Sequence, residues 1–369
     1  MKGNGKKTIL ILDFNVVYEL LAGVSVVTLL QNDPIYNYEV VFNQNCALED
    51  TLQDFGVTTH RLPFAASNRA IQFLNLIFLI PRIIYLFLKI RPDLVHANNV
   101  LAARFGVIFK ILFRTPLITH IRNVGLPPRT KWICYFTDRF ACVSEITAKL
   151  SLDSHFLNKV DVVYDGFLLR SEIQNTKTKE IDLKRKPNSN LLRVGMCSRL
   201  SSQKAVDDFC LMAENLNMNS RCTFHHAGGM PSTKSDNPYS VSLALNYSGT
   251  VDWVGYIEDI SEFWSDIDIA IFPPRGHEAF GRVVAEAMAL GIPVISSKCG
   301  GPEEIIINGV SGILLDHGDI DGFVEHINRL ACDVKLRKEI GEAGRLRVLK
   351  NFSIKRYVAR LHSCYEQVI

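Results

Sequence analysis

The stretch IDIAIFPPRGHEAFGRVVAEAMALGIPVISS, residues 267–297, joins two apolar runs through a loop and a helical pattern. Its first part, IDIAIFPP (267–274), predicts a buried strand that stops at two prolines. A glycine-containing loop leads to a predicted helix around residues 282–290, and IPVISS (292–297) predicts the next strand. Strand, helix and strand in this order predict a parallel βαβ unit.

The same alternation covers the chain on both sides of a polar stretch. Six strand-like runs precede it, with helical patterns such as residues 99–113 between most of them: TILILDF (8–14), YEVVFNQ (38–44), DLVHANN (93–99), PLITHI (116–121), RFACVS (139–144) and VDVVYDG (160–166). After it come a helix from about Val206 and further strands: LLRVGMCSRL (191–200), CTFHHAGG (222–229), VDWVGYI (251–257) and GILLDHGD (312–319). The predicted fold class is α/β, with two Rossmann-like doubly wound parallel sheets.

The chain has 369 residues, more than one hydrophobic core usually organises. We therefore expect two domains, with the polar, highly charged stretch as their linker. The expected boundaries are 1–170 for the first domain, 171–190 for the linker, 191–352 for the second domain, and 353–369 for a helix packing across the domains.

Composition excludes several classes of protein. Hydrophobic residues make up 47% of the chain and charged residues 21%, which is typical of a folded globular protein and not of a disordered one. The nine cysteines are scattered, without CxxC pairs or zinc-ligand spacing, which favours a reducing compartment over a disulfide framework or structural metal site. The N-terminal stretch MKGNGKKTILILDFN superficially resembles a signal peptide, but its apolar run ends early at Asp13 and predicts a first strand.

A basic, apolar segment stands out in the first half. Between Arg69 and Lys131 there are ten Lys or Arg residues and one acid, Asp93. Within it, residues 71–90 have apolar side chains at fifteen of twenty positions. Such a helix either packs against a sheet or lies partly sunk in an anionic membrane surface. A transmembrane span is a third interpretation, which the polar interruptions and Pro81 oppose.

Two glutamates eight positions apart, Glu278 and Glu286, point to ligand binding. The loop before the helix favours an anion through its backbone N–H groups, so Glu278 either caps the helix or accepts hydrogen bonds from ligand hydroxyls. Eight helical residues rise roughly 12 Å, and somewhat less if Glu278 lies in the loop before the helix. This is about the separation of a hexose and a ribose joined by a pyrophosphate. Glu286 lies among apolar residues, and a carboxylate on a mostly buried helix needs a partner. The spacing thus suits a nucleotide sugar.

Two cations follow the first strand of the second domain. GMCSRLSSQKA (195–205) carries Arg199 and Lys204 just where a strand leads into a helix. Arginine with its planar fork and lysine as a point charge suit a diphosphate, although the pair could also be two surface charges. Beside the glutamate pair, the diphosphate interpretation becomes the stronger one.

These motifs together resemble a retaining glycosyltransferase of the GT-B fold, in glycosyltransferase family 4. The resemblance rests on the E-x7-E pattern in PPRGHEAFGRVVAEAMALGIPVISSKCGGPEEII, the SRLSSQK loop, HHAGG (225–229), VDWVGYIEDISEFWSDIDIAIFPP, INGVSGILL (307–315), ACVSE (141–145) and VVYDG (162–166). It implies two Rossmann-like domains facing across a cleft, with a nucleotide-diphosphate sugar bound by the second.

The resemblance also assigns roles to residues. It places Glu278 on sugar hydroxyls, Glu286 on the ribose, and Arg199 and Lys204 on the diphosphate. The other donor-binding residues it implies are Gly228, Ala279, Phe280 and Gly281. His120 would lie beside the reacting centre and share the catalytic role with Glu278, although alone it would pass for an interior histidine. Gly23 and Arg122 are assigned to the acceptor and phosphate side.

Three positions depart from the family pattern. LLAGVS (20–25) keeps only Gly23 of a usual Gly-Gly pair, which puts the contacts of that loop in doubt. Asp165–Gly166 stands where many members have Asn-Gly. Lys204–Ala205 stands where they have Lys-Gly, which we interpret as a small change.

The resemblance implies hexosyl transfer to a saccharide acceptor with retention of anomeric configuration. We expect neither a metal nor another cofactor, since Arg199 and Lys204 can meet the charge of the leaving diphosphate and no DxD triad follows a strand. Same-face displacement is favoured because no carboxylate stands out as a covalent nucleophile. The basic apolar segment favours a lipid-linked acceptor, and a cytoplasmic enzyme peripheral on an anionic membrane. That fits the synthesis of cell-surface polysaccharide or lipopolysaccharide in the cell envelope. No nucleic acid partner is expected.

Other functions stay open from the residues alone. A nucleotide-sugar epimerase could use the same fold and release sugar without any acceptor. A catalytically silent GT-B-fold partner protein could keep the fold and bind a membrane or another transferase. A dinucleotide dehydrogenase is disfavoured because no G-x-G-x-x-G follows TILILDF.

Overall fold

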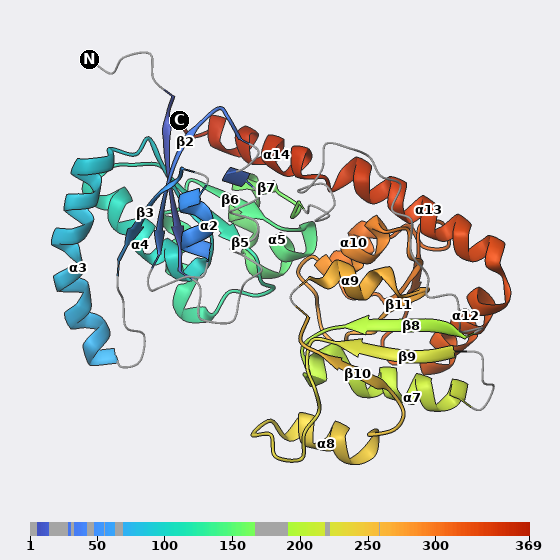
Figure 1. Ribbon diagram of the computed structural model, residues 1–369. Helices are drawn as coiled ribbons and strands as arrows, with labels where there is room; N and C mark the ends of the chain where they lie inside the picture. The colour runs from blue at the N-terminus through green and yellow to red at the C-terminus, as the bar shows by residue number, and fades with distance from the viewer. Residues whose placement is uncertain are drawn as a thin grey trace. The chain divides into compact units, whose positions relative to one another are not determined.

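Two parallel β-sheets organise the chain in its computed structural model (Figure 1). The structure describes residues 6–14, 29–30, 33–42, 48–54, 56–62, 69–166, 191–217, 222–257 and 259–369. One compact unit comprises Met1–Phe167 with Ile354–Ile369, and the other comprises Leu168–Ser353. The predicted α/β class with two Rossmann-like parallel sheets is confirmed. The predicted linker, 171–190, lies outside the described residues, as does Gly23.

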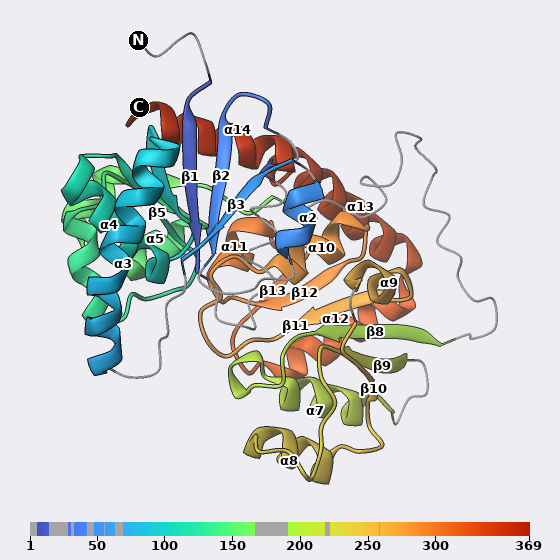
Figure 2. The ribbon, with the colours of Figure 1, turned by 60° about the vertical axis from the view of Figure 1, so that its left-hand side comes forward.

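The first unit is built on seven strands in the order β3-β2-β1-β4-β5-β6-β7. Every neighbouring pair in this sheet is parallel, and Figure 2 shows β1, β2 and β3 side by side. The central strands are buried along almost their whole length, which explains their continuous apolar runs. The strands are β1 (Thr8–Asp13), β2 (Asn37–Phe42), β3 (Thr58–Arg61), β4 (Leu94–Ala97), β5 (Leu117–Ile121), β6 (Arg139–Cys142) and β7 (Val160–Val162).

Helices connect these strands and cover the sheet. The segments are α2 (Leu48–Asp54), α3 (Arg69–Ile90), α4 (Val100–Phe113), η1 (Pro128–Tyr135), α5 (Glu145–Ser151), η2 (Ser154–Lys159) and, from the far end of the chain, α14 (Ile354–Glu366). The first turn of α4 is fixed because the Asn99 side chain accepts a hydrogen bond from the backbone N–H of Ala102 (2.8 Å). These crossovers keep the strands parallel.

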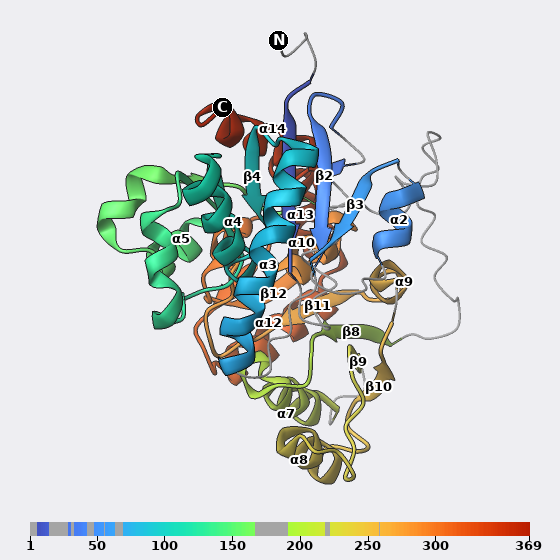
Figure 3. The same cartoon turned by 90° about the vertical axis from the view of Figure 1, so that its left-hand side faces the viewer.

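The helix α3 packs against the first unit through one face. Leu79, Ile83 and Leu86 are buried in the core that α4 also lines, and the rings of Phe87 and Phe113 stack with centroids 3.7 Å apart. Figure 3 shows α3 running along the unit beside α4. The helix continues through Pro81. No helix among the described residues is long and apolar enough to cross a membrane.

The second unit has six strands in the order β10-β9-β8-β11-β12-β13, again with every neighbouring pair parallel. Its strands are β8 (Leu192–Cys197), β9 (Cys222–Ala227), β10 (Asp252–Gly255), β11 (Ile269–Phe272), β12 (Val294–Ser297) and β13 (Ile313–Leu315). Its helical segments are η3 (Ser202–Lys204), α7 (Val206–Asn217), α8 (Pro238–Asn246), α9 (Ile260–Ser265), α10 (Arg282–Ala289), α11 (Gly301–Ile305), α12 (Ile320–Cys332) and α13 (Val334–Asn351).

The helices of the second unit pack in two groups. The helix α7 contacts β9 and α12, whereas α10 contacts β11, β12 and α13. Apolar residues of α7 and α12 close the main core over β8 and β9, among them Phe209, Phe323 and Ile327. The helix α10 buries Val284, Ala287 and Met288. The strand–loop–helix–strand pattern of residues 267–297 therefore folds as the sequence predicts.

Two elements of the first unit differ from the sequence prediction. The strand expected at 160–166 is shorter, since β7 ends at Val162. The strand β3 was not predicted, because its sequence TTHR is polar and none of its residues is buried. A short polar edge strand lacks the apolar run by which buried strands are recognised.

The helix α14 packs closely on the loop after β7, at Gly166. A Cβ atom on Gly166 would lie 2.8 Å from the Cβ of Tyr357 and 3.0 Å from the Cα of Ile354. The second contact is with backbone, which cannot rotate aside.

We predict that Gly166→Ala destabilises the protein by about 1–3 kcal/mol, as overpacking in a close contact does. Thermal unfolding measures the effect. Gly249→Ala is the matched control, because a Cβ there has no neighbour within 4 Å. Equal melting temperatures for both variants would show that α14 does not press on this loop.

Candidate functional site

The predicted donor residues of the second unit lie on loops at the carboxyl ends of strands. The strands β8 and β11 are neighbours although β9 and β10 come between them in sequence. Successive strands are therefore added to one side of β8 up to β10 and to its other side from β11 onward. Ligands of open α/β sheets bind at such a switch point. Lys204 lies on the loop that follows β8, and Glu278 lies on the loop that follows β11. The topology brings the two loops together.

Backbone hydrogen bonds hold the Glu278 loop on both sides. The Glu278 N–H donates to the carbonyl of Cys299 (2.7 Å), and the Glu278 carbonyl accepts from the N–H of Gly301 (2.9 Å). The N–H of Arg275 donates to the carbonyl of Gln203 (2.9 Å), which links this loop to the residue before Lys204. The loop is thus fixed to the loops after both β8 and β12.

Arg275 strengthens this link with its side chain. Its guanidinium forms ion pairs with Asp207, at 2.9 Å, and with Asp208, both in the first turn of α7. The hydroxyl of Tyr239 also donates to Asp207 (2.6 Å). Burial, partly opposed by Arg275, raises the pKa of Asp208. Arg275 therefore positions the two loops relative to each other.

Lys204 and Glu278 form an ion pair. Their side chains are 20% and 23% exposed, and the Lys204 ammonium lies 5.2 Å from the centroid of the Phe272 ring. Ala205 follows with φ 54°, a left-handed conformation that costs a residue with a Cβ on the order of 1 kcal/mol. The Gly-to-Ala departure interpreted as small is therefore a strained position. The structure brings together two of the predicted donor residues.

Glu286 lies one turn into α10, eight residues after Glu278, and its side chain is largely buried. Arg282, one turn earlier, donates to it at 3.3 Å. Burial raises the pKa of Glu286, and the Arg282 guanidinium opposes that rise. Burial, and then the negative charge of Glu286, raise the pKa of Cys197 at the end of β8 to about 12. The buried partner expected for Glu286 is Arg282.

The remaining predicted donor residues lie around these groups. Arg199 is exposed in the loop after β8. Gly228 follows β9 with φ 111°, and a Cβ there would lie 2.3 Å from the Ser198 carbonyl oxygen, so only glycine fits. Phe280 is buried with its ring 5.7 Å from Phe352. Ala279 is partly exposed, and Gly281 is the N-cap residue of α10.

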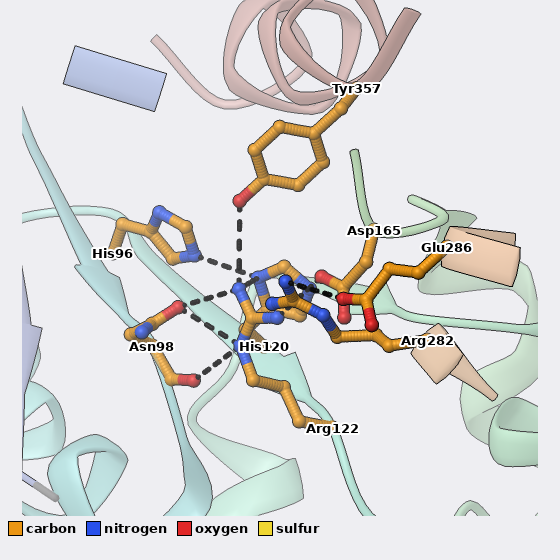
Figure 4. Close-up of polar contacts among 8 residues, drawn as sticks. All are labelled: His96, Asn98, His120, Arg122, Asp165, Arg282, Glu286 and Tyr357. Carbon is orange, nitrogen blue, oxygen red and sulfur yellow. Dashed lines mark hydrogen bonds and ion pairs between the residues drawn. The ribbon is translucent and has the colours of Figure 1, made fainter. Parts of the chain in front are cut away.

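The predicted residues of the first unit, His120 and Arg122, share one polar cluster (Figure 4). His120 is fully buried on β5, and its Nδ1 lies 3.4 Å from an Arg122 nitrogen and 3.3 Å from Nε2 of His96. The Nδ1 of His96 lies 2.8 Å from the hydroxyl of Tyr365 on α14. Figure 4 also draws the Arg282–Glu286 contact of the second unit.

These contacts define which nitrogen of His120 carries its proton. A guanidinium has only donors, so Nδ1 of His120 must accept from Arg122. His96 then donates to the same Nδ1 from Nε2, and its own Nδ1 accepts from Tyr365. A neutral His120 consequently carries its proton on Nε2. That atom is buried and has no hydrogen-bond partner among the residues described.

The charge of Arg122 has its own counter-charge. Its guanidinium donates to Asp165 (2.6 Å), to the side-chain oxygen of Asn98 (2.8 Å) and to the hydroxyl of Tyr357 (3.5 Å). Burial alone would lower the pKa of Arg122, but Asp165 and Tyr357 raise it. The family departure from Asn to Asp at position 165 thus supplies the anion that a buried arginine requires.

Sequence reasoning missed several members of these clusters. Arg282 stands four positions before Glu286, a spacing that pairs side chains on a helix and could have identified it. His96 and Asn98 end the predicted strand 93–99, where polar residues at a carboxyl end are a recognisable signal. Tyr357 and Tyr365 come from α14, more than 230 residues away from their partners, and no local pattern could have shown them.

Comparison with known proteins agrees with this architecture. The family model described as Glycosyl transferases group 1 matches residues 177–347. The capsular polysaccharide biosynthesis glycosyltransferase CapM of Staphylococcus aureus is 25% identical over 308 residues, which cover 77% of this chain and 79% of CapM. The lipopolysaccharide core biosynthesis glycosyltransferase LpsE of Rhizobium meliloti (strain 1021) is 31% identical over 118 residues, 32% of this chain and 34% of LpsE.

A solved structure covers nearly the whole chain. The crystal structure of Anabaena Alr3699/HepE in complex with UDP superposes with a TM-score of 0.76 at 19% identity, over 98% of this chain and 100% of that one. This chain has the GT-B fold. Together with the family match to the second unit, these relatives support a GT-B glycosyltransferase.

The buried histidines of this GT-B protein predict a specific pH response. Burial and Arg122 lower the pKa of His96 to about 3, and the same causes with His96 hold that of His120 well below its usual range. Both rings should remain neutral from pH 7 to pH 5. The unfolded chain takes up protons at both rings near pH 6.5, so their stabilising effect is complete above that pH and declines as the pH falls.

We expect the ring signals of His96 and His120 to show no titration in NMR spectra between pH 7 and 5, with assignments from His96→Asn and His120→Asn. The acid-unfolded protein provides the reference shifts. An inflection between pH 6 and 7 for either ring would contradict the assignment of a neutral pair.

Proposed function

We propose that this chain transfers a hexosyl group from a nucleotide-diphosphate sugar to a saccharide acceptor, with retention of anomeric configuration. The observation that carries the proposal is the cluster at the switch point of the second sheet. There Lys204 and Glu278 meet, and Glu286 follows one turn into α10. The cluster suits a ligand that has hydroxyls at both ends and a diphosphate between them.

Each end of the donor has a chemically matched group. Glu278 accepts hydrogen bonds from sugar hydroxyls, and Glu286 accepts them from the ribose. Lys204 and the exposed Arg199 bind the diphosphate, with the N-terminus of α10 adding a partial positive charge. A hydroxyl-to-carboxylate hydrogen bond is charge-assisted and therefore stronger than a neutral one.

The same groups can support the transfer step. Glycosyl transfer passes through an oxocarbenium-like transition state, as described for glycosidases. The leaving diphosphate gains negative charge in that state, and fixed cations stabilise it without a metal ion. We assign the reaction to same-face displacement, in which the departing phosphate takes the proton of the acceptor hydroxyl.

The first unit is assigned to the acceptor, and His120 to the reaction centre. A neutral imidazole with its proton on Nε2 can donate a hydrogen bond to a sugar oxygen. It is a poor general base, because the protonated form is disfavoured by burial and by Arg122. We therefore assign His120 to substrate orientation, with Arg122 holding its ring in place.

We assign the acceptor to the lipid-linked class because α3, α4 and η1, three segments that share one hydrophobic core, expose apolar side chains. The exposed apolar side chains are Ile84, Tyr85 and Leu88 on α3, Ile111 and Leu112 on α4, and Trp132, Tyr135 and Phe136 in and beside η1. Exposed basic side chains accompany them: Arg82, Lys89, Arg91, Arg114, Arg129 and Lys131. Apolar and basic groups together suit an anionic membrane surface. CapM and LpsE, named for capsular and lipopolysaccharide synthesis, agree with this assignment.

The donor site is tested by thermal shift with a panel of UDP-, GDP-, ADP- and TDP-sugars. A ligand at 100 times its Kd stabilises a protein by about 2.7 kcal/mol. We expect the nucleotide sugars of one base to stabilise the wild type. Glu286→Gln should bind the same ligand at least about tenfold more weakly, because the ribose hydroxyls lose a charged hydrogen-bond acceptor. Glu339→Gln, an exposed glutamate of α13, is the control.

Product analysis with membrane extract then separates the functions. Sugar incorporated into a lipid-extractable saccharide supports the transferase, whereas altered free sugar without acceptor would indicate an epimerase. Absence of binding to every nucleotide sugar would indicate a catalytically silent protein.

The membrane assignment is tested by sedimentation with vesicles. We expect the wild type to pellet with phosphatidylglycerol vesicles at low salt and less with phosphatidylcholine vesicles. The double variant Tyr85→Ser/Leu88→Ser should pellet severalfold less, since both side chains are at least 60% exposed and available to lipid. Leu245→Ser, at a 68% exposed position of the second unit, should behave like the wild type. No vesicle binding by the wild type would reject the assignment.

A further inference from the structure

In the second unit, two residues assigned to different parts of the donor neutralise each other. Lys204, assigned to the diphosphate, is paired with Glu278, assigned to the sugar. A nucleotide sugar must therefore replace an existing ion pair and cannot simply occupy open charges. From this pairing we propose that Glu278 competes with the diphosphate for Lys204, so that the site retains a nucleotide sugar and releases the sugar-free nucleoside diphosphate. The inference rests on the proposed donor site.

The pair is strong enough to compete because it is shielded from water. Less than a quarter of either side chain is exposed. Fully exposed ion pairs contribute little because water and salt screen them, whereas partly buried pairs are screened much less. The ring of Phe272 beside the ammonium excludes water from one more side.

Hydrogen bonds also hold the backbones of both partners, so the two side chains start from fixed positions. Lys204 ends η3, with its N–H donating to the Ser201 carbonyl (3.0 Å). Glu278 is fixed by Cys299 and Gly301, and Arg275 ties the two loops together. Pairing therefore orders the two side chains without moving the loops that carry them.

The ion pair should weaken binding of the nucleoside diphosphate more than binding of the nucleotide sugar. A nucleoside diphosphate that binds Lys204 must break its ion pair with Glu278, and it brings no sugar hydroxyls to stabilise the released carboxylate. A nucleotide sugar brings hydroxyls as well, which donate to the Glu278 carboxylate and compensate for the lost ammonium. Once the sugar has been transferred, that compensation is gone. Glu278 can then pair with Lys204 again, which favours departure of the product.

The experiment compares UDP with UDP-glucose by isothermal titration calorimetry, followed by the GDP, ADP and TDP pairs if the donor screen selects another base. Glu278→Gln keeps the shape of the side chain and removes its charge. We expect this variant to bind the nucleoside diphosphate about tenfold more tightly than the wild type does, while its affinity for the nucleotide sugar is unchanged or lower.

A double-mutant cycle assigns the effect to the pair. In a Lys204→Met background, Glu278→Gln should raise the affinity for the nucleoside diphosphate by less than about twofold, because the lysine for which Glu278 and the diphosphate compete is absent. Glu262→Gln removes the same charge from an exposed position on α9 and should change neither affinity. Glu278→Ala is a second variant that removes the same charge. A melting curve for each variant shows whether it is folded.

The outcomes separate the inference from the function on which it rests. Unchanged nucleoside-diphosphate affinity in Glu278→Gln overturns the competition and leaves the donor site standing. An equal gain for both ligands, or a gain that persists without Lys204, also overturns it. Failure of the wild type to bind any nucleotide or nucleotide sugar rejects the proposed function, and the competition with it.

Discussion

Every strand neighbour in both described sheets is parallel, and this constraint decides where chemistry can occur. Parallel strands need a crossover after each strand, and all their carboxyl ends reach the same edge of the sheet. Residues far apart in sequence, such as Lys204 and Glu278, therefore meet without any local interaction that guides them. The loops are short and joined by backbone hydrogen bonds, so the side chains they carry have few alternative positions.

The two polar clusters neutralise a shielded positive charge in different ways. In the first unit, Arg122 is buried and almost fully satisfied by Asp165, Asn98 and Tyr357, so it acts as a fixed support for His120. In the second unit, Lys204 has one carboxylate partner that is itself assigned to the ligand. A cation whose hydrogen bonds are nearly all made, such as Arg122, holds its neighbours rigidly. A cation such as Lys204, whose carboxylate partner is assigned to the ligand, can change partners when a ligand binds.

The sequence predicted most of the second unit because its signals are local. Buried strands, the helix after Gly281 and the eight-residue glutamate spacing are all contained in residues 267–297. The strand β3 was missed because its polar residues carry no burial pattern. The partners of His96 and Arg122 on α14 were missed because contacts between residues more than 230 positions apart leave no periodic pattern in the sequence. The strain at Ala205 depends on a backbone angle that composition does not reveal.

The return of α14 to the first unit has a consequence for how the protein is made. During synthesis, His96 and Arg122 leave the ribosome long before Tyr357 and Tyr365. Their hydrogen bonds to these hydroxyls can form only after the whole second unit has been made. The second unit has its whole sequence available earlier and can fold as translation proceeds. The order of folding thus differs from the order of the chain, because the first unit can be completed only after the second.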